Sequence, residues 1–272
     1  MAKTIAYLLV NWLIILGSIV LTLRYPYIFV LTFFMISNRQ FANYLVGHDG
    51  LHGSISRNVT VNRFVAKYFC LYPVLVSFYA YQTNHLAHHR FLGGPIDPDL
   101  KLYNFYPLSF AKFARRLTFG FLNGSLLLDF LKYFTPVNQF LRSTTRSSWR
   151  TGDYLEYMIA VLALIGLLWA IGGLWLLCIW FLPLLLMIPY YYFVSALQHG
   201  LIHQLATPAN SRNIDGSRII MEIFLPCSTH LHGVHHDHPS VPFHQLASYQ
   251  NKDAAAVESL WSTTKLLFAR PT

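Results

Sequence analysis

The fold of this chain is decided by residues 154–195, YLEYMIAVLALIGLLWAIGGLWLLCIWFLPLLLMIPYYYFVS, its clearest membrane signal. This stretch contains no lysine or arginine, and Glu156 is its only charged residue. About twenty apolar residues are enough for one helix to cross a bilayer core of about 30 Å. Because Gly172-Gly173 lies near the middle, the stretch predicts two transmembrane helices joined by a tight turn.

The N-terminal region predicts a second pair of helices. Residues 5–23 are apolar, and no small-residue cleavage site follows them. We therefore expect a retained helix rather than a signal peptide that is removed. Arg24-Tyr25-Pro26 interrupts the apolar pattern, which resumes at Tyr27 and is expected to continue as a helix to about Val46.

A third apolar stretch, residues 64–81, is shorter and is interrupted by Lys67 and Pro73. A dipping or interfacial hairpin and a full crossing both fit this stretch. The chain then turns polar and basic, and residues 105–133 mix aromatic with cationic side chains. This mixture is typical of an interfacial amphipathic helix, although solvated helices of no special role fit it equally well.

The composition supports a membrane protein. The chain is 54% hydrophobic and only 11% charged, whereas about a quarter of the residues in an ordinary soluble domain are charged. With this hydropathy, the net charge of +9 indicates contact with anionic lipid headgroups rather than with nucleic acid. It also suits the docking of an acidic protein or substrate group. The three cysteines lie far apart and predict neither a disulfide framework nor a thiolate metal site.

Lysine and arginine predict the orientation in the membrane. The two expected turns, near Arg24 and Gly172, carry one cation between them, and nearly all other cations lie in the opposite segments. The positive-inside rule therefore places the N-terminus and residues 38–153 and 198–272 in the cytoplasm. The sequence predicts an all-α, multi-pass integral membrane protein with about four transmembrane helices in two hairpins and a cytoplasmic, histidine-rich helical cap. No repeat or domain boundary is visible, so residues 1–272 are expected to form one domain.

Thirteen histidines fall in four groups, each just past the end of an expected membrane segment and on the expected cytoplasmic side. Residues 48–52 contain an i, i+4 pair, and residues 85–89 and 232–236 each contain an i, i+3, i+4 triplet. On a helix, such spacings bring the imidazoles to one side. The candidate ligands in these three groups are His48, His52, His85, His88, His89, His232, His235 and His236.

Eight imidazoles exceed what one four-coordinate metal ion needs. They suit two ions, each with several nitrogen ligands and an open position. Neutral imidazole binds zinc, copper, iron and nickel, so the residue types alone leave the metal open. None of the groups contains the cysteine that is common in closed structural zinc sites. Outside the three groups, we expect ordinary structural roles for His203, His230, His238 and His244.

These motifs resemble the membrane fatty acid desaturase and hydroxylase superfamily. The three matching boxes are His48-Asp49-Gly50-Leu51-His52, His85-xx-His88-His89 and His232-xx-His235-His236. Three supporting patterns are Asp97-Pro98-Asp99, Pro239-Ser240-Val241-Pro242, and Gln198-His199-Gly200, which resembles the family's E-H-G and adds His199 as a ninth ligand. The resemblance extends from about residue 40 to residue 250.

The resemblance implies a non-heme centre of two iron ions (Fe²⁺/Fe³⁺) with O2 as co-substrate, and no catalytic residues beyond the metal ligands. Two electrons are expected from a separate ferredoxin- or cytochrome-type protein, because the chain has no haem or four-cysteine iron–sulfur motif. The basic loops offer such a donor an electrostatic landing surface. The expected substrate is a lipid or another long apolar molecule that enters from the bilayer, and the active site lies on the cytoplasmic face.

Some positions have two interpretations. Gln198 replaces the acidic residue that is common before the histidine in this family. Asp49 is either a group that orients a ligand histidine or a residue at a helix N-terminus. Asp97 and Asp99 are either orienting groups or part of an ordinary turn that contains Asp97-Pro98-Asp99. The aromatic residues in 64–81 and 190–193 could line a substrate route, although packing is the more ordinary role.

Several functions remain in competition. Desaturation of an acyl chain is preferred, while a carotenoid ketolase or hydroxylase and an alkyl-chain hydroxylase share the same boxes. From other classes, a zinc-dependent membrane hydrolase fits the histidines. A metal transporter fits less well, because its ligands are expected at mid-depth in the membrane rather than at its edge.

Overall fold

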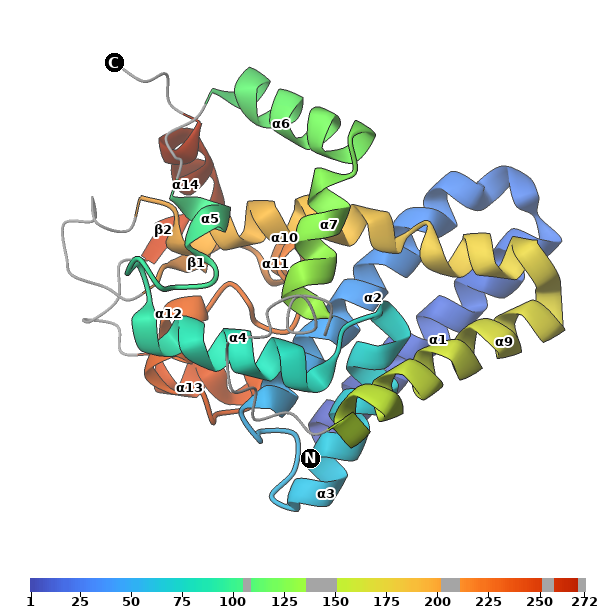
Figure 1. The fold of residues 1–272 in the computed structure, drawn as a ribbon. Coiled ribbons are helices and arrows are strands. Elements are labelled where there is room, and N and C mark those ends of the chain that lie inside the picture. Colours follow the sequence, from blue (N-terminus) through green and yellow to red (C-terminus); the bar gives the residue numbers. More distant parts are fainter. Residues whose placement is uncertain (105–108, 136–150, 202–210, 251–256, 269–272) are drawn as a thin grey trace. The chain divides into compact units, whose positions relative to one another are not determined.

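The computed structural model describes residues 1–104, 109–135, 151–201, 211–250 and 257–268. These residues are predominantly helical, which confirms the predicted helical class, and they include one short parallel strand pair (Figure 1). The chain divides into two compact units, each assembled from two stretches. Unit 1 combines Met1–Gln82 with Asp129–Ile188, and unit 2 combines Thr83–Leu128 with Pro189–Thr272.

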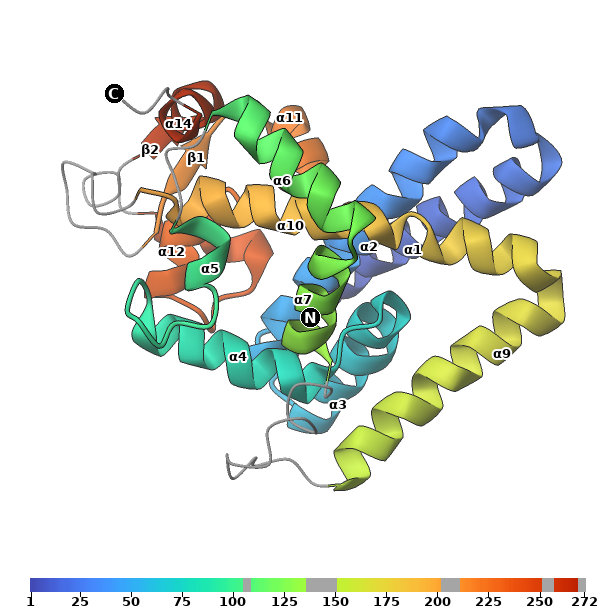
Figure 2. The same cartoon turned by 45° about the horizontal axis from the view of Figure 1, so that its top comes forward.

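Unit 1 begins with a helical hairpin. Helix α1 (Ala2–Arg24) ends at Tyr25, a 3₁₀ turn (η1, Pro26–Ile28) follows, and α2 (Phe29–Leu51) runs back beside α1 in both views (Figures 1 and 2). Tyr25 leaves the helical conformation immediately before Pro26, as expected for a residue that precedes proline. The first hairpin that the sequence predicts is therefore present as a pair of helices.

Polar side chains join α1 to α2 inside this hairpin. Asn11 Nδ2 donates to Asn43 Oδ1 at 3.0 Å, and the hydroxyls of Thr22 and Thr32 are hydrogen-bonded to each other. Small and polar residues at buried helix contacts are typical of helices that pack in a membrane, where apolar contact alone gives little preference for a partner.

The decisive apolar stretch forms α9 (Thr151–Phe181) and α10 (Leu184–His199). The chain reverses sharply within α9 at Gly173, whose φ of 57° and ψ of −147° are not helical (Figure 2). Glycine adopts such angles without a steric clash. A turn therefore lies at Gly172-Gly173, where the sequence predicts one, and a second break follows at Leu182-Pro183.

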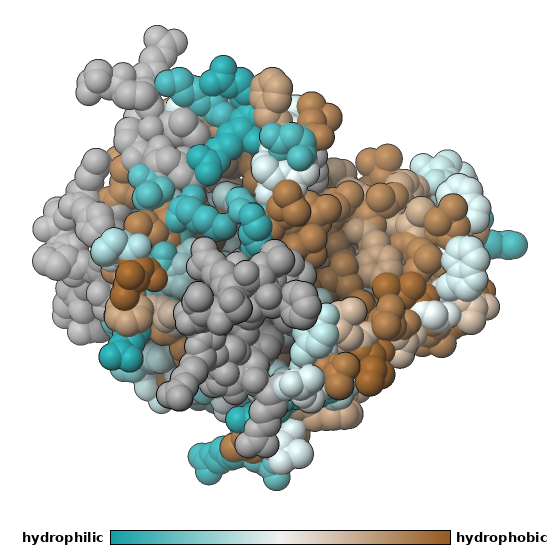
Figure 3. Space-filling model, viewed as in Figure 1, coloured by the Kyte–Doolittle hydropathy of each residue, from teal (hydrophilic) through white to brown (hydrophobic). Residues whose placement is uncertain are grey.

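The α1–α2 hairpin and α9 share one hydrophobic core. Its buried members come from all three helices and are Ile15, Ile19, Ile36, Leu168, Leu176, Ile179 and Trp180. Hydrophobic side chains also gather on the visible face over α1, α2 and α9 (Figure 3). This combination of a shared core and apolar outer faces is expected of helices surrounded by lipid.

Two helical segments among the described residues are long and apolar enough to cross a membrane, α1 and residues 151–199. Helix α2 equals α1 in length but carries Asn38, Arg39 and Gln40 at its middle, which lowers its hydropathy. Residues 59–74 and α4 (Phe78–Phe91) form a third candidate only if their 97° bend lies within one broken span.

That bent segment is the third apolar stretch of the sequence. It comprises α3 (Val59–Val65), a π-helical turn (η2, Ala66–Leu71) and a 3₁₀ turn (η3, Tyr72–Val74) before α4. Leu75 has a φ of 63°, a left-handed conformation that is uncommon for leucine and breaks the helix. The predicted interruption is therefore real, and the geometry is that of a broken span or a re-entrant loop.

Unit 2 carries most of the predicted histidine ligands. Its α12 (His232–Asp237) and the last part of α4 hold the two histidine triplets. Strand β1 (Asn213–Asp215) pairs in parallel with β2 (Val257–Ser259), with Asn213 opposite Val257. The remaining elements are α5 (Leu100–Tyr103), α6 (Phe110–Leu122), α7 (Ser125–Phe134), which begins in this unit, α11 (Arg218–Phe224), η5 (Phe243–Gln245), α13 (Leu246–Tyr249) and α14 (Leu260–Leu267).

The aromatic and basic region forms two helices rather than one. Helix α6 ends at Leu122 and α7 begins at Ser125, because Gly124 between them has a positive φ of 73°. Part of this region, residues 105–108, and the cations Arg142, Arg146 and Arg150 lie outside the described residues.

Candidate metal centre

The two histidine triplets of unit 2 divide in the same way. In α4, His85 and His89 lie next to His235 of α12, whereas the ring of His88 contacts His199. In α12, His232 and His236 lie next to His199. Residues four apart differ by about 40° around a helix, and residues three apart by about 60° in the opposite direction. The i, i+4 pair of each triplet therefore faces one group, and the middle histidine faces the other.

The first group, called the His85 cluster, consists of His85, His89 and His235. The Nε2 atom of His89 lies 3.0 Å from Nε2 of His85 and 3.2 Å from Nε2 of His235. His85 and His235 are buried and His89 is half-buried. Three nitrogens from two helices thus converge on one point.

The second group, called the His199 cluster, consists of His88, His199, His232 and His236. The Nε2 atom of His232 lies 3.1 Å from Nε2 of His199 and 3.2 Å from Nε2 of His236. One ring nitrogen of each member lies within 4.8 Å of those of the other three. The clusters are adjacent, because the rings of His89 and His236 stack with centroids 4.2 Å apart.

These distances fit metal coordination better than hydrogen bonding. Two nitrogens bound to one ion at about 2.1 Å, with an angle of about 90–110°, lie about 3.0–3.4 Å apart. A neutral imidazole offers one N–H and one lone pair, on different nitrogens. The three Nε2 atoms that meet at His232 therefore cannot all be paired with one another, whereas one cation can accept a lone pair from each. Imidazole without thiolate suits iron, and also zinc or copper.

Asp97 fixes the orientation of one candidate ligand. Its Oδ1 atom lies 2.9 Å from Nδ1 of His88 and accepts the backbone N–H of Asp99 at 2.9 Å. Its Oδ2 atom accepts the backbone N–H of Gly93 at 3.0 Å and the hydroxyl of Tyr103. With Nδ1–H of His88 donating to Asp97, the lone pair of His88 is on Nε2, where a metal can use it.

The surroundings of Asp97 keep it ionised. Burial opposes ionisation, but the hydrogen bonds from His88, Tyr103 and the backbone outweigh burial and lower the pKa of Asp97 below its usual range. Burial and the hydrogen bond to Asp97 raise the pKa of Tyr103, which therefore stays protonated and remains a donor. Because four donors occupy the carboxylate, Asp97 orients a ligand rather than binding a metal itself. Of its two interpretations, the orienting role is the one that the geometry favours.

Asp99 extends this arrangement. Its Oδ2 atom accepts the hydroxyl of Tyr191 at 3.3 Å and lies 3.8 Å from Nδ1 of His88. The aromatic segment 190–193 thus has at least one polar contact near the site, beside the packing role expected for it.

Arg212 holds the end of α10, where His199 is located. The Arg212 side chain is fully buried, and its guanidinium donates to the carbonyls of Leu197 at 2.7 Å and Gly200 at 3.0 Å. Its Nε atom lies 3.2 Å from Oε2 of Glu258. Burial lowers the pKa of Arg212, an effect that Glu258 opposes. A cation at a helix C-terminus satisfies carbonyls that lack helical partners, so Arg212 stabilises the position of His199.

The start of α12 is set by β1. Ile214 N–H donates to the carbonyl of His230 at 2.7 Å, and Asn213 Oδ1 accepts the N–H of Val234 at 3.2 Å. A Cβ atom at Gly233 would lie 3.0 Å from Asn213 Oδ1 and from the carbonyl of Ser211. The glycine in His232-Gly233-Val234-His235-His236 therefore permits this close approach.

The first histidine box lies in unit 1. His48 is in the last turn of α2 and His52 caps that helix, with ring centroids 5.4 Å apart. The alternative interpretation of Asp49 as a helix N-terminal residue is wrong, because Asp49 is near the C-terminal end of α2. Its Oδ1 atom is 4.0 Å from Nδ1 of His48, which is longer than a hydrogen bond.

Three histidines expected to be structural lie among the described residues, and none of the three joins either cluster of unit 2. Among the described residues, His230 precedes α12, exposed His238 contacts the ring of Tyr249, and His244 lies in η5. His203 lies outside the described residues. Sequence reasoning missed Arg212 and Tyr103, because a single cation or tyrosine in a polar segment carries no spacing signal.

Comparison with known proteins decides the family. A family model for fatty acid desaturases matches residues 21–264, nearly the whole chain. The chain belongs to the fatty acid desaturase family. This membership confirms the resemblance drawn from the three boxes. Together with desaturase and ketolase relatives, it supports an oxidoreductase with membrane helices and histidine clusters that can hold metal.

Three relatives of this desaturase-family chain carry different names. It is 26% identical to the dihydrorhizobitoxine desaturase of Bradyrhizobium elkanii, over 92% of this chain and 70% of the relative. It is 28% identical to the sn-1 acyl-lipid omega-3 desaturase (ferredoxin) of Synechocystis, over 57% of this chain and 46% of that protein. It is 27% identical to the beta-carotene ketolase of Paracoccus, over 78% of this chain and 75% of the relative. The match thus spans less than half of the omega-3 desaturase.

Proposed function

We propose that this chain is a membrane-bound, non-heme di-iron oxidoreductase that uses O2 to desaturate the acyl chain of a lipid. The convergence of seven imidazoles in two adjacent clusters carries the proposal. Two metal ions, held by these two clusters, would suit the activation of a small molecule such as O2. Family membership supports iron over zinc or copper.

The proposed ligands are the nine histidines that the sequence predicts. The geometry of unit 2 supports seven of them, in the His85 and His199 clusters. His48 and His52 are included because they form the first of the three histidine boxes by which the chain resembles the family. We also propose that residues 1–272 act as one domain, because one family model matches residues 21–264.

The overall reaction uses an external reductant. When bound, the iron pair would supply the redox chemistry that reduces O2 to two water molecules. Two electrons come from the donor, two hydrogens come from the substrate and two protons come from solvent. The substrate loses one hydrogen from each of two neighbouring carbons and gains a double bond. The chain's own contribution is to hold the imidazoles with their Nε2 lone pairs inward and to keep the site dry.

The proposed donor is a separate ferredoxin- or cytochrome-type protein. A relative named for ferredoxin supports the first choice. The net charge of +9 suits an acidic donor, whose approach would be steered by the basic segments.

For topology, we propose four transmembrane helices in two hairpins, with the active site on the cytoplasmic face. The α1–α2 hairpin and the reversal at Gly173 support two hairpins. The uneven distribution of lysine and arginine supports the orientation.

A second candidate is the oxidation of a carotenoid. The match to a beta-carotene ketolase that covers 75% of that protein favours it over the remaining alternatives. Profiling lipids and carotenoids in a carotenoid-producing host, with and without this chain, separates the two candidates. We expect additional double bonds in acyl chains. An unchanged acyl profile together with oxidised carotenoids would contradict desaturation and favour the second candidate.

A further inference from the structure

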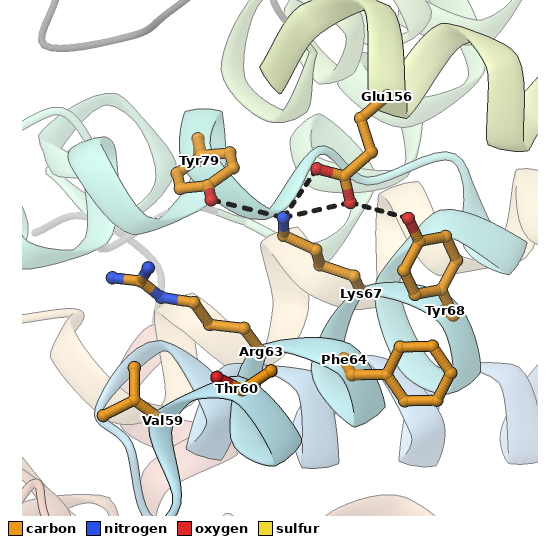
Figure 4. A pocket seen from close by; sticks show the side chains of 8 residues that line it. All are labelled: Val59, Thr60, Arg63, Phe64, Lys67, Tyr68, Tyr79 and Glu156. Carbon is orange, nitrogen blue, oxygen red and sulfur yellow. Dashed lines mark hydrogen bonds and ion pairs between the residues drawn. The ribbon is translucent and has the colours of Figure 1, made fainter. Parts of the chain in front are cut away.

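A pocket in unit 1 has no histidine in its lining. It has a volume of about 290 Å³ and is formed by α3, η2, α4 and α9 (Figure 4). Its polar lining consists of Thr60, Arg63, Lys67, Tyr79 and Glu156, and its apolar and aromatic lining consists of Val59, Phe64 and Tyr68.

The ammonium group of Lys67 is hydrogen-bonded to residues that line the pocket. Its Nζ atom donates to both carboxylate oxygens of Glu156, at 3.0 and 2.8 Å, and to the hydroxyl of Tyr79 at 3.2 Å. The hydroxyl of Tyr68 also donates to Glu156 at 2.8 Å. An ammonium group has three protons, and all three are used. Lys67 and Glu156 thus neutralise each other.

Arg63 has no such partner. Among the described residues, no carboxylate or other side chain pairs with its guanidinium, and Figure 4 shows it directed away from Glu156. Because the charges of Lys67 and Glu156 cancel, the lining of the pocket has a net charge of one positive unit, at Arg63. A guanidinium presents several N–H donors in a fork that fits the oxygens of phosphate.

Exposed apolar side chains lie close to Arg63 in the chain. Val59, Phe64 and Phe69 are 61%, 53% and 44% exposed, although they are apolar. These residues belong to the first arm of the bent candidate span. A soluble anion would make no favourable contact with these apolar side chains. A lipid would pack its acyl chains against them and place its headgroup in the pocket.

We propose that this pocket binds the phosphate headgroup of an anionic membrane phospholipid, with Arg63 as the recognising cation and the Thr60 hydroxyl as a further donor. The ion pair between Lys67 and Glu156 forms the wall of the site. This inference rests on the residues of unit 1 and does not depend on the metal centre or on the proposed reaction.

The test uses the purified full chain in nanodiscs that contain phosphatidylglycerol and phosphatidylcholine. Native mass spectrometry after mild release counts the lipids that each variant retains. We expect wild type to retain phosphatidylglycerol in preference. Arg63→Gln should lower this preference about tenfold or more, the value of a lost hydrogen bond to a charged group, and Arg63→Lys should keep part of it.

Arg57→Gln is the matched control, because Arg57 is also exposed and lies six residues away but does not line the pocket. It should retain the wild-type preference. Equal losses in Arg57→Gln and Arg63→Gln would overturn the proposal in favour of general surface charge. Displacement of the lipid by millimolar inorganic phosphate alone would also overturn it, because the ligand would then be a free anion.

Discussion

The Nδ1 atom of His88 lies 2.9 Å from the Oδ1 atom of Asp97, and both side chains are buried. Since Asp97 also accepts hydrogen bonds from Asp99, Gly93 and Tyr103, it is itself held rigidly. This carboxylate therefore determines both the tautomer and the rotation of the His88 ring, which points its Nε2 atom toward the His199 cluster.

Replacing Asp97 with asparagine should weaken metal binding. The amide presents an NH2 group either to His88 or to the donors Gly93 and Tyr103, so at least one hydrogen bond is lost. Loss of such an orienting partner typically costs about 10- to 100-fold in metal affinity. Competition with a chelator measures this affinity directly. Asp215→Asn, at an exposed carboxylate on β1, is the control, and wild-type metal retention in Asp97→Asn would rule out the orienting role.

His88→Ala should abolish activity while leaving membrane insertion intact. His88 belongs to the His199 cluster, and its loss removes one of four convergent nitrogens. Product analysis in cells and membrane fractionation are measured together. His238→Ala, at an exposed histidine outside both clusters, should behave as wild type. Full activity of His88→Ala would refute the ligand assignment.

Arg212→Gln should destabilise unit 2. The substitution leaves the buried carbonyls of Leu197 and Gly200 without their charged donor, at about 1–3 kcal/mol for each group. The Tm of the purified protein should fall by roughly 5–10 °C. Arg218→Gln, at an exposed arginine in α11, should leave Tm unchanged. If both variants melt like wild type, the guanidinium does not hold the end of α10.

Gly233→Ala should disturb the third histidine box without removing a ligand. The added methyl group meets Asn213 Oδ1 and the carbonyl of Ser211 at 3.0 Å, so α12 or β1 must shift. We expect severalfold weaker metal retention in the same chelator competition. Gly166→Ala is a suitable control, because a Cβ atom there meets nothing within 4 Å. Equal metal retention in the two variants would show that the close approach is unimportant.

Much of the fold could be predicted because its signals are local. The apolar stretch 154–195, the break at Pro26 and the pair Gly172-Gly173 each act through neighbouring residues in sequence. The spacing of residues 85–89 and 232–236 likewise predicted that imidazoles would share a helix side. Spacing did not predict that His88 and His235 would turn to the opposite cluster from their neighbours, since that depends on where α4 and α12 meet.

The residues that support the site could not be predicted, because their contacts join positions that are distant in the sequence. Arg212 and Glu258 are 46 positions apart, and only the folded chain brings them together. Asp97 had two interpretations in the sequence, and its contacts with His88 and Tyr103 favour one of them. Of the two interpretations of Asp49, the helix N-terminal one is wrong, since α2 continues to Leu51. Nothing in the surrounding sequence indicates this continuation.

The central claim is that the histidines hold two iron ions. Elemental analysis of the purified full chain, with iron, zinc and copper quantified per mole of protein, tests it most directly. We predict about two irons per chain in wild type and a clear loss in His199→Ala, with no loss in His238→Ala. Zinc alone in wild type would contradict the claim and favour a hydrolase, and a chain without bound metal would contradict it outright.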